Sequence, residues 1–287
     1  MLLDTFPAFT DFWRDARNLP LDEQIRGWKE AYLQAWPGLA TMQIEDYRAQ
    51  GVDWQEIARD RVFPFLDERM QAMEAAHAIL LELCDPIRQR AITAIGLSRN
   101  ILFVVHVGLG CGAGWSTKFQ DSPAILFGLE NIAELGWNSR DVLTGLIAHE
   151  IGHLAHYQWR AQGKIPLEDG PWSQLCDEGI AQCCESLILN TSILHQSCIG
   201  AEGDWLAWCT GHKSWLAAEF LRVVQANEPV SKFFGSWFEI QGRSETGYFL
   251  GQAVVEALMA KGCSLEGISQ LDPEQAAKPI LEDFSRE

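Results

Sequence analysis

Apolar residues recur at three- and four-residue spacing between residues 21 and 96, and acidic residues stand near the starts of these segments. This is the pattern of amphipathic helices. The pattern changes at residues 100–108, NILFVVHVG, where a β-branched and aromatic run ends in glycine and predicts a strand. A second apolar run at residues 123–129 predicts another strand. We therefore expect a helical layer followed by a small sheet.

The remainder of the chain returns to helical spacing. A long helix is expected over residues 138–162, with Asn138 or Ser139 able to cap its amino end and Gly163 able to end it. The glycines and prolines of GKIPLEDGP at residues 163–171 indicate a loop. Further helices are predicted over residues 172–190, 203–227, 245–261 and 273–284. The expected fold class is α+β, mainly α, with residues 1–96 as a helical region packed on residues 97–287 in one compact unit.

Composition and charge narrow the classes of function. The chain has 287 residues, of which 47% are hydrophobic, so it can bury a substantial core. Its net charge of −17 argues against a nucleic-acid surface, which needs clustered Lys and Arg. No apolar run approaches the length of a membrane helix, and the first residues carry acids where a secretory signal would be basic. The eight cysteines contain no CxxC pair, which favours reduced thiols and a cytoplasmic protein.

The stretch LIAHEIGHLAHYQW, residues 146–159, contains two histidines four positions apart. On a helix, His149 and His153 can present two imidazole nitrogens to one point. Glu150 lies next to His149, close to a bound metal but not on it, where a carboxylate can take a proton from a water activated by the metal. The alternative is a helix of buried histidines, in which each ionisable group would need a buried partner. The motif predicts one catalytic zinc ion per chain.

A catalytic zinc needs a third protein ligand. His156 lies only three residues after His153 and would point away by about 60° on the helix, so we expect it to lie in the core or outside the ligand set. Glu178 follows in the next helix, and an antiparallel pair of helices would bring it beside His153. The small residues Gly179 and Ala181 would allow a close approach. Glu178 is therefore the expected third ligand.

Two other acids of the same helix are alternatives. Asp177 would be the ligand if the helix were rotated by one residue, or it could support the site from outside the ligand set. Glu185, two turns beyond Glu178, could orient His149 or His153. The nearby Cys176, Cys183 and Cys184 lack the paired spacing of thiolate zinc sites, which favours core packing.

The motifs HEIGH and EGIA, separated by a turn, resemble the gluzincin clan of zinc metallopeptidases. GYFLGQAVVEAL at residues 247–258 is similar to the Tyr-x-x-Gly helix start of several gluzincin families. The order of a helical amino-terminal region, a glycine-rich strand pair, HExxH, EGxA and Tyr-x-x-Gly is most similar to the YjaZ-like family of predicted zinc-dependent proteases. The resemblance covers most of the chain in order and spacing, but only these short motifs are specific.

The resemblance implies a zincin-like active-site helix, a carboxy-terminal helix bundle and a small sheet with an edge strand beside the cleft. It implies zinc ligation by His149, His153 and Glu178, with Glu150 as general base and Tyr248 as hydrogen-bond donor to the developing oxyanion. A peptide or protein substrate would add as a strand to the segment formed by Ala124, Ile125, Leu126, Phe127 and Gly128. The expected activity is peptide-bond hydrolysis by a zinc-activated water.

Several alternatives remain. FGLEN at residues 127–131 resembles the segment with which aminopeptidases of the clan hold a free amine, so Glu130 could direct exopeptidase action. GLGCGA at residues 108–113 formally fits a dinucleotide fingerprint, but no helix is expected after it. CGAGW at residues 111–115 is similar to the papain signature, with Gly114 at the position of the nucleophile. A protein of another class, which keeps the zinc but acts as a binding or regulatory module, would have no use for a general base.

Overall fold

The computed structural model describes residues 1–97, 100–192, 194–198, 204–235 and 237–287. The chain divides into two compact units, residues 1–89 with 98–147 and residues 90–97 with 148–287. The division differs from the boundary expected between residues 96 and 97. The reason is that the sheet begins at the start of the chain: β1 (Leu2–Asp4) pairs with β2 (Leu102–His106), so the sheet groups with the amino-terminal helices.

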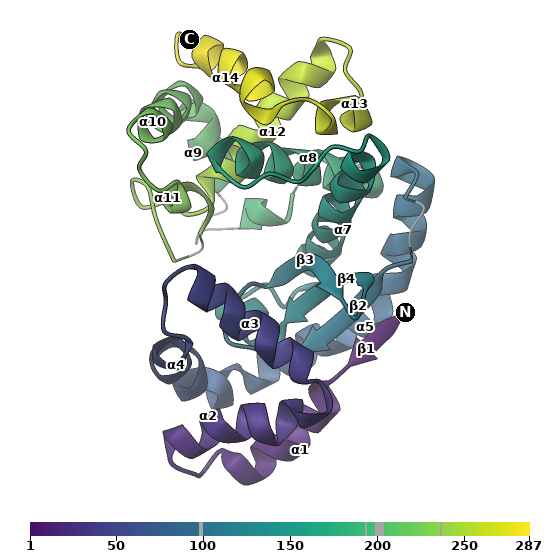
Figure 1. The fold of residues 1–287 in the computed structure, drawn as a ribbon, viewed down its shortest axis with the longest axis vertical. Coiled ribbons are helices and arrows are strands. Elements are labelled where there is room, and N and C mark those ends of the chain that lie inside the picture. The colour runs from purple at the N-terminus through teal and green to yellow at the C-terminus, as the bar shows by residue number, and fades with distance from the viewer. Residues whose placement is uncertain (98–99, 193, 199–203, 236) are drawn as a thin grey trace. The chain divides into compact units, whose positions relative to one another are not determined.

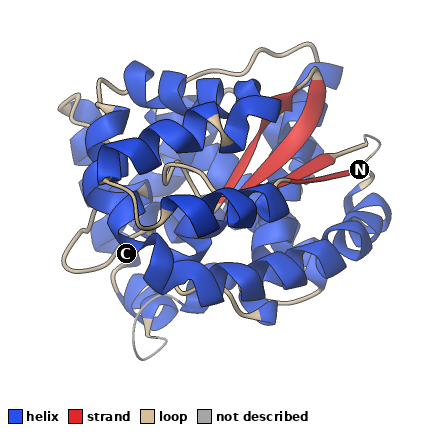
Figure 2. Ribbon diagram, turned by 90° about the horizontal axis from the view of Figure 1, so that it is seen from below, coloured by secondary structure: helices blue, strands red, loops and turns tan. Residues whose placement is uncertain are grey.

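The first unit combines helices with a four-stranded sheet of order β1-β2-β4-β3 (Figure 1). Strands β1, β2 and β4 (Ser122–Gly128) are parallel, and β3 (Gly114–Phe119) is antiparallel to β4. Its main helices are α1 (Phe6–Ala16), α2 (Leu21–Glu30), α3 (Pro37–Ala49), α4 (Trp54–Ile57), the greater part of α5 (Leu66–Ile95), and α6 (Leu129–Glu134). The mainly α class with a small sheet is confirmed (Figure 2).

The expected substrate strand, residues 124–128, is not at an edge of the sheet. It lies in β4, where Ala124 to Phe127 pair with β2 on one side and with β3 on the other. The backbone groups that would receive an added strand are therefore already used, and the expectation of an exposed edge there is wrong. The cause is a tight hairpin at Gln120 and Asp121, whose positive φ values of 49° and 61° fold β3 back along β4.

The glycine-rich segment at residues 108–113 is a loop fixed by a buried acid. Glu130 accepts hydrogen bonds from the backbone N–H of Gly108 at 2.7 Å and of Gly110 at 2.9 Å. A Cβ atom at Gly108 would collide with the Gln43 side chain, so the backbone passes too close for any larger residue. Close packing accounts for Gly108, and a positive φ of 78° accounts for Gly110, without a nucleotide. Both oxygens of Glu130 are engaged, which removes the support for amine binding by this residue.

The second unit is helical. It contains the end of α7 (Arg140–Gln162) from residue 148, followed by α8 (Pro171–Leu189), α9 (Trp205–Gly211), α10 (Lys213–Gln225), α11 (Ser231–Phe234), α12 (Thr246–Ala260), α13 (Leu265–Ser269) and α14 (Pro273–Phe284). The helix expected over residues 203–227 is two helices separated at His212, and its first residue, 203, lies outside the described residues. The helices expected over residues 172–190, 245–261 and 273–284 correspond to α8, α12 and α14.

Glycines set how closely the central helices of this unit pack. Gly152 of α7 faces α8, and a Cβ atom there would lie 2.8 Å from Ala181 Cα. Gly179 of α8 faces α12 instead, where a Cβ atom would collide with the Gly251 carbonyl. The small residues on α8 thus contact two different helices. Ala181 lies against α7, and Gly179 lies against α12.

The cysteine thiols that the structure describes are free. Seven cysteines have described side chains and none is in a disulfide, as their scattered spacing predicts. Cys176, Cys183 and Cys184 are buried in α8, and burial raises the pKa of the Cys176 and Cys183 thiols to about 12. The side chain of Cys198 lies outside the described residues. The α8 cysteines therefore pack in the core.

Candidate metal centre

Helix α7 brings the two histidines of the motif together. The Nε2 atoms of His149 and His153 lie 3.1 Å apart, and the two rings are nearly perpendicular, with centroids separated by 4.8 Å. Both residues are buried. Two buried imidazoles that aim the same ring nitrogen at one point are arranged to share a cation.

Helix α8 adds the carboxylate expected from the sequence. Glu178 Oε2 lies 3.2 Å from His149 Nε2 and 3.4 Å from His153 Nε2. The contacts pair early residues of one helix with late residues of the other, from His149 with Glu185 to Tyr157 with Asp177, so the two helices are antiparallel. The three ligand atoms form a triangle with sides of 3.1, 3.2 and 3.4 Å.

This triangle fits a small tetrahedral ion. Ligand atoms bound to zinc at about 2.0–2.1 Å in tetrahedral geometry are separated by about 3.3 Å. The three sides found here, from 3.1 to 3.4 Å, surround that value. His149, His153 and Glu178 are therefore residues that could hold a metal ion, in the donor set expected from the sequence.

Asp177 contacts the ring nitrogen of His153 that does not belong to the triangle. Its Oδ1 atom lies 3.0 Å from His153 Nδ1, and because a carboxylate only accepts, the Nδ1–H group donates to it. The Tyr157 hydroxyl donates to the other oxygen at 3.3 Å. This arrangement fixes the tautomer of His153 that leaves Nε2 with a lone pair for a cation. Asp177 therefore contacts His153 from outside the group that could hold a metal ion, and Glu178 belongs to that group.

Glu185 is the second supporting acid, and it has a partner that sequence reasoning missed. It is fully buried and accepts hydrogen bonds from the backbone N–H and the Nδ1–H of His195, both at 2.8 Å. Its Oε2 atom lies 3.9 Å from His149 Nδ1, which is beyond hydrogen-bond distance. His149, Glu185 and His195 form a second group that could hold a metal. No periodic spacing links Glu185 to His195, which precedes α9 in a short 3₁₀ turn, so the sequence carried no signal for it.

Glu150 and Tyr248 belong to the same unit. Glu150 is buried on α7 beside the histidines. Tyr248 lies in the first turn of α12, and its ring centroid is 5.8 Å from that of His149. Glu245, immediately before that helix, is buried with a positive φ of 57° and has an oxygen without a hydrogen-bond partner among the described residues. Its burial raises its pKa to about 7.

Charge and burial compete within the site. Burial lowers the pKa of His153, but the Asp177 and Glu178 carboxylates outweigh this effect and raise it well above its ordinary value. Burial raises the pKa of Glu178, but the two histidines lower it to about 2. The neighbouring His156, whose contact with Asp177 is longer at 4.0 Å, has its pKa lowered by burial to about 4. The pocket formed by the three ligand residues therefore favours positive charge.

Comparison of the chain with protein-family models, with curated proteins and with solved structures finds no match. The resemblance to the gluzincins thus stays a prediction, and the case for the site depends on its geometry and chemistry. Within the part of the chain that the structure describes, the helices are too short or too polar to span a membrane.

Proposed function

We propose that this chain is a cytoplasmic zinc-dependent metallopeptidase that hydrolyses peptide bonds in a peptide or protein substrate. The observation that carries the proposal is the triangle of His149 Nε2, His153 Nε2 and Glu178 Oε2, with sides of 3.1 to 3.4 Å. Two imidazoles and one carboxylate are a ligand set that catalytic zinc sites use.

The number of ligands supports a catalytic site over a structural one. Structural zinc sites are closed by four protein ligands, whereas catalytic sites have three and keep one position open. Each metal-capable group found among the described residues contains three members. The buried thiols of α8, which would suit a structural site, are not among them.

A zinc ion held by these residues would supply Lewis-acid chemistry, polarising a water molecule and a substrate carbonyl. Glu150, which is buried and adjacent to His149, would accept a proton from the attacking water and pass it to the leaving amine. Tyr248 lies beside His149 and carries a phenol, which stays protonated at neutral pH and can donate a hydrogen bond to the carbonyl oxygen as negative charge develops there.

The test begins with metal analysis of the purified protein, followed by assays on casein and on mixed peptides. We expect one zinc per chain and cleavage by the wild type. Glu150→Gln should retain the zinc and lose at least about 100-fold in kcat, since general bases contribute about 10²- to 10⁴-fold. Glu266→Gln, an exposed change on α13, is the matched control and should leave both properties unchanged.

Two results would contradict the proposal. If the purified protein binds no zinc, the proposed metal centre is wrong. A chain that binds one zinc but cleaves no substrate in either form would instead favour a binding or regulatory module with the same fold.

A further inference from the structure

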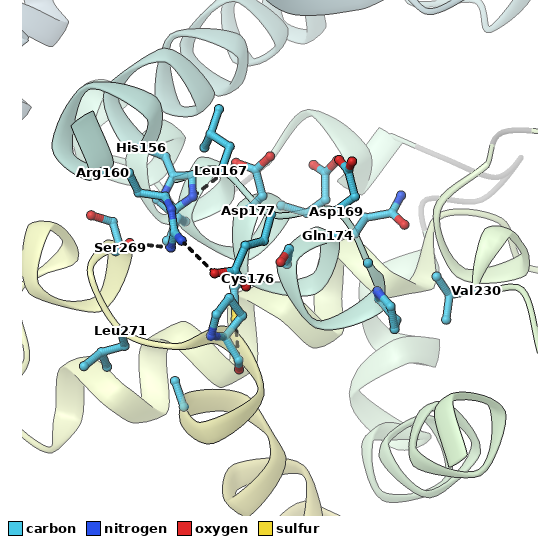
Figure 3. A pocket seen from close by; sticks show the side chains of 18 of the residues that line it. His156, Arg160, Leu167, Asp169, Gln174, Cys176, Asp177, Val230, Ser269 and Leu271 are labelled. Atoms are coloured by element: carbon cyan, nitrogen blue, oxygen red, sulfur yellow. Dashed lines mark hydrogen bonds and ion pairs between the residues drawn. The ribbon is translucent and has the colours of Figure 1, made fainter. Parts of the chain in front are cut away.

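A cavity of about 600 Å³ opens beside Asp177 and Glu178 (Figure 3). Its wall is formed by the end of α7, the loop of residues 163–170, the start of α8, Pro229 and Val230, and the segment from α13 to the start of α14. A volume of this size is typical of sites that enclose a small ligand or a side chain. The cavity therefore borders the candidate metal centre on the side of the third ligand.

The lining is negatively charged. It contains the carboxylates of Glu168, Asp169, Asp177, Glu178 and Glu228. Its only Lys or Arg side chain is Arg160. Among the described residues Glu228 is paired with Arg222, at 2.8 and 2.9 Å. Glu178 belongs to the metal triangle. Asp177 is already engaged by His153 at 3.0 Å and by Tyr157 at 3.3 Å. This leaves Asp169 as the carboxylate of the lining that has no ion-pair partner among the described residues.

Arg160 does not neutralise this lining. Its guanidinium donates to the Pro166 carbonyl at 3.0 and 2.6 Å and to the Ser269 carbonyl at 3.0 Å, which fixes it in the wall (Figure 3). Its carboxylate neighbour is Glu168, at 3.9 Å. Arg160 is thus occupied by carbonyls and by one acid, and Asp169 has no ion-pair partner among the described residues.

The rest of the wall suits an aliphatic stem that carries a hydrogen-bonding head. Leu167 is 58% exposed and Leu271 is 40% exposed, although both are large apolar residues that line the cavity. His156, also in the wall, is 6% exposed, and its Nδ1 atom has no hydrogen-bond partner among the described residues. Lys and Arg side chains combine an apolar stem with a charged head that donates several hydrogen bonds. Apolar walls, the unpaired Asp169 carboxylate and an unpartnered buried nitrogen are the complement of such a side chain.

We propose that this cavity binds a Lys or Arg side chain of the substrate, and so gives the site a preference for peptides with a basic residue near the cleaved bond. The inference rests on the proposed function, because it assigns the substrate class of the same metal centre. Asp177 connects the two sites, since it accepts from His153 and also lines the cavity.

The experiment compares hydrolysis of two peptides that differ only in Arg against Gln at one position, scanned along the peptide. We expect the wild type to show a kcat/KM at least about tenfold higher for the Arg peptide at the preferred position, as one hydrogen bond to a charged group implies. Asp169→Lys should abolish this ratio, and Asp169→Asn should reduce it about threefold, in line with a partly exposed ion pair. The Arg/Gln ratio is compared within each variant, and Glu266→Gln, an exposed change outside the cavity lining, should leave kcat/KM for both peptides unchanged.

A second measurement separates this inference from the proposed function. Calorimetry with the Glu150→Gln protein should show tighter binding of the Arg peptide than of the Gln peptide, and Asp169→Lys in that background should remove the difference. Equal kcat/KM for the two peptides, in a wild type that cleaves both, would overturn the cavity assignment and leave the peptidase intact. Selective binding of the Arg peptide by a chain that cleaves nothing would support the cavity and overturn the peptidase.

Discussion

Replacement of Gly152 by alanine tests whether the close approach of α7 and α8 sets the metal-capable triangle. A Cβ atom at Gly152 would lie 2.8 Å from Ala181 Cα, 2.8 Å from Cys184 Cβ and 3.0 Å from the Ala181 carbonyl oxygen. Carbon atoms pack at about 3.5–4.0 Å, so the helices would have to separate by about 1 Å at this level. Two of these three atoms are backbone atoms, which cannot move away by a change of rotamer.

The expected cost follows from two opposing effects. Overpacking against rigid neighbours destabilises a core by about 2–3 kcal/mol, and alanine recovers roughly 1 kcal/mol as the better helix former. We expect a net loss of about 1–2 kcal/mol in the free energy of unfolding of the metal-free protein, measured by urea denaturation. Glu178 would also move away from the two imidazoles. Zinc affinity, measured by chelator competition, should therefore fall about 10- to 100-fold, as when groups that position metal ligands are lost.

Gly211→Ala is the matched control. Gly211 ends α9, has a negative φ, and would place its Cβ atom in open space. Its replacement should leave zinc affinity unchanged and alter stability by less than about 1 kcal/mol. If Gly152→Ala bound zinc as tightly as the wild type and unfolded at the same urea concentration, the close packing of these helices would not be what positions Glu178.

Two further predictions concern His153. Asp177→Asn removes the charged partner of its Nδ1–H, so zinc affinity should fall about 10- to 100-fold with little loss of helicity; unchanged affinity would show that the 3.0 Å contact does not support the ligand. In the metal-free protein, burial lowers the pKa of His153 but Asp177 and Glu178 raise it well above 6.5, so its contribution to stability is complete below pH 6.5 and is lost as pH rises through the folded pKa. The urea midpoint of the metal-free protein should therefore fall as pH rises above about 6.5, and a midpoint that instead rises with pH would contradict the assignment.

The grouping of His149, His153 and Glu178 could be predicted because it depends mainly on local geometry. The four-residue spacing of His149 and His153 places both rings on one helix face, whatever the tertiary structure. Glu178 required one further step, the antiparallel return of the next helix after a loop with clear glycine and proline signals. Ala181 supported that step, because a small residue opposite Gly152 is what lets the helices approach.

The features that sequence reasoning missed depend on pairing between distant segments. Strand β1 has only three residues, and its pairing with β2, about one hundred residues later, leaves no periodic pattern. Strand β3 is joined to β4 by Gln120 and Asp121 rather than by the Asn-Gly or Asp-Gly pair that marks such hairpins. The edge strand at residues 124–128 was an expectation from the family resemblance, and the pairing with β3 occupies that edge. The contact of His195 with Glu185 similarly links a helix to a short turn without regular spacing.

Asp177 and Glu178 are adjacent on α8, but they contact different nitrogens of the histidine rings. A step along a helix turns a side chain by about 100°, so exchanging these two positions would exchange the ligand with its support. In the fold, Glu178 faces Nε2 of both histidines and Asp177 faces Nδ1 of His153. His153 is therefore held between two carboxylates, one on each ring nitrogen. His149 lacks this arrangement, because Glu185 Oε2 lies 2.8 Å from His195 Nδ1 but 3.9 Å from His149 Nδ1. His153 is consequently the imidazole whose orientation the protein fixes before any cation arrives.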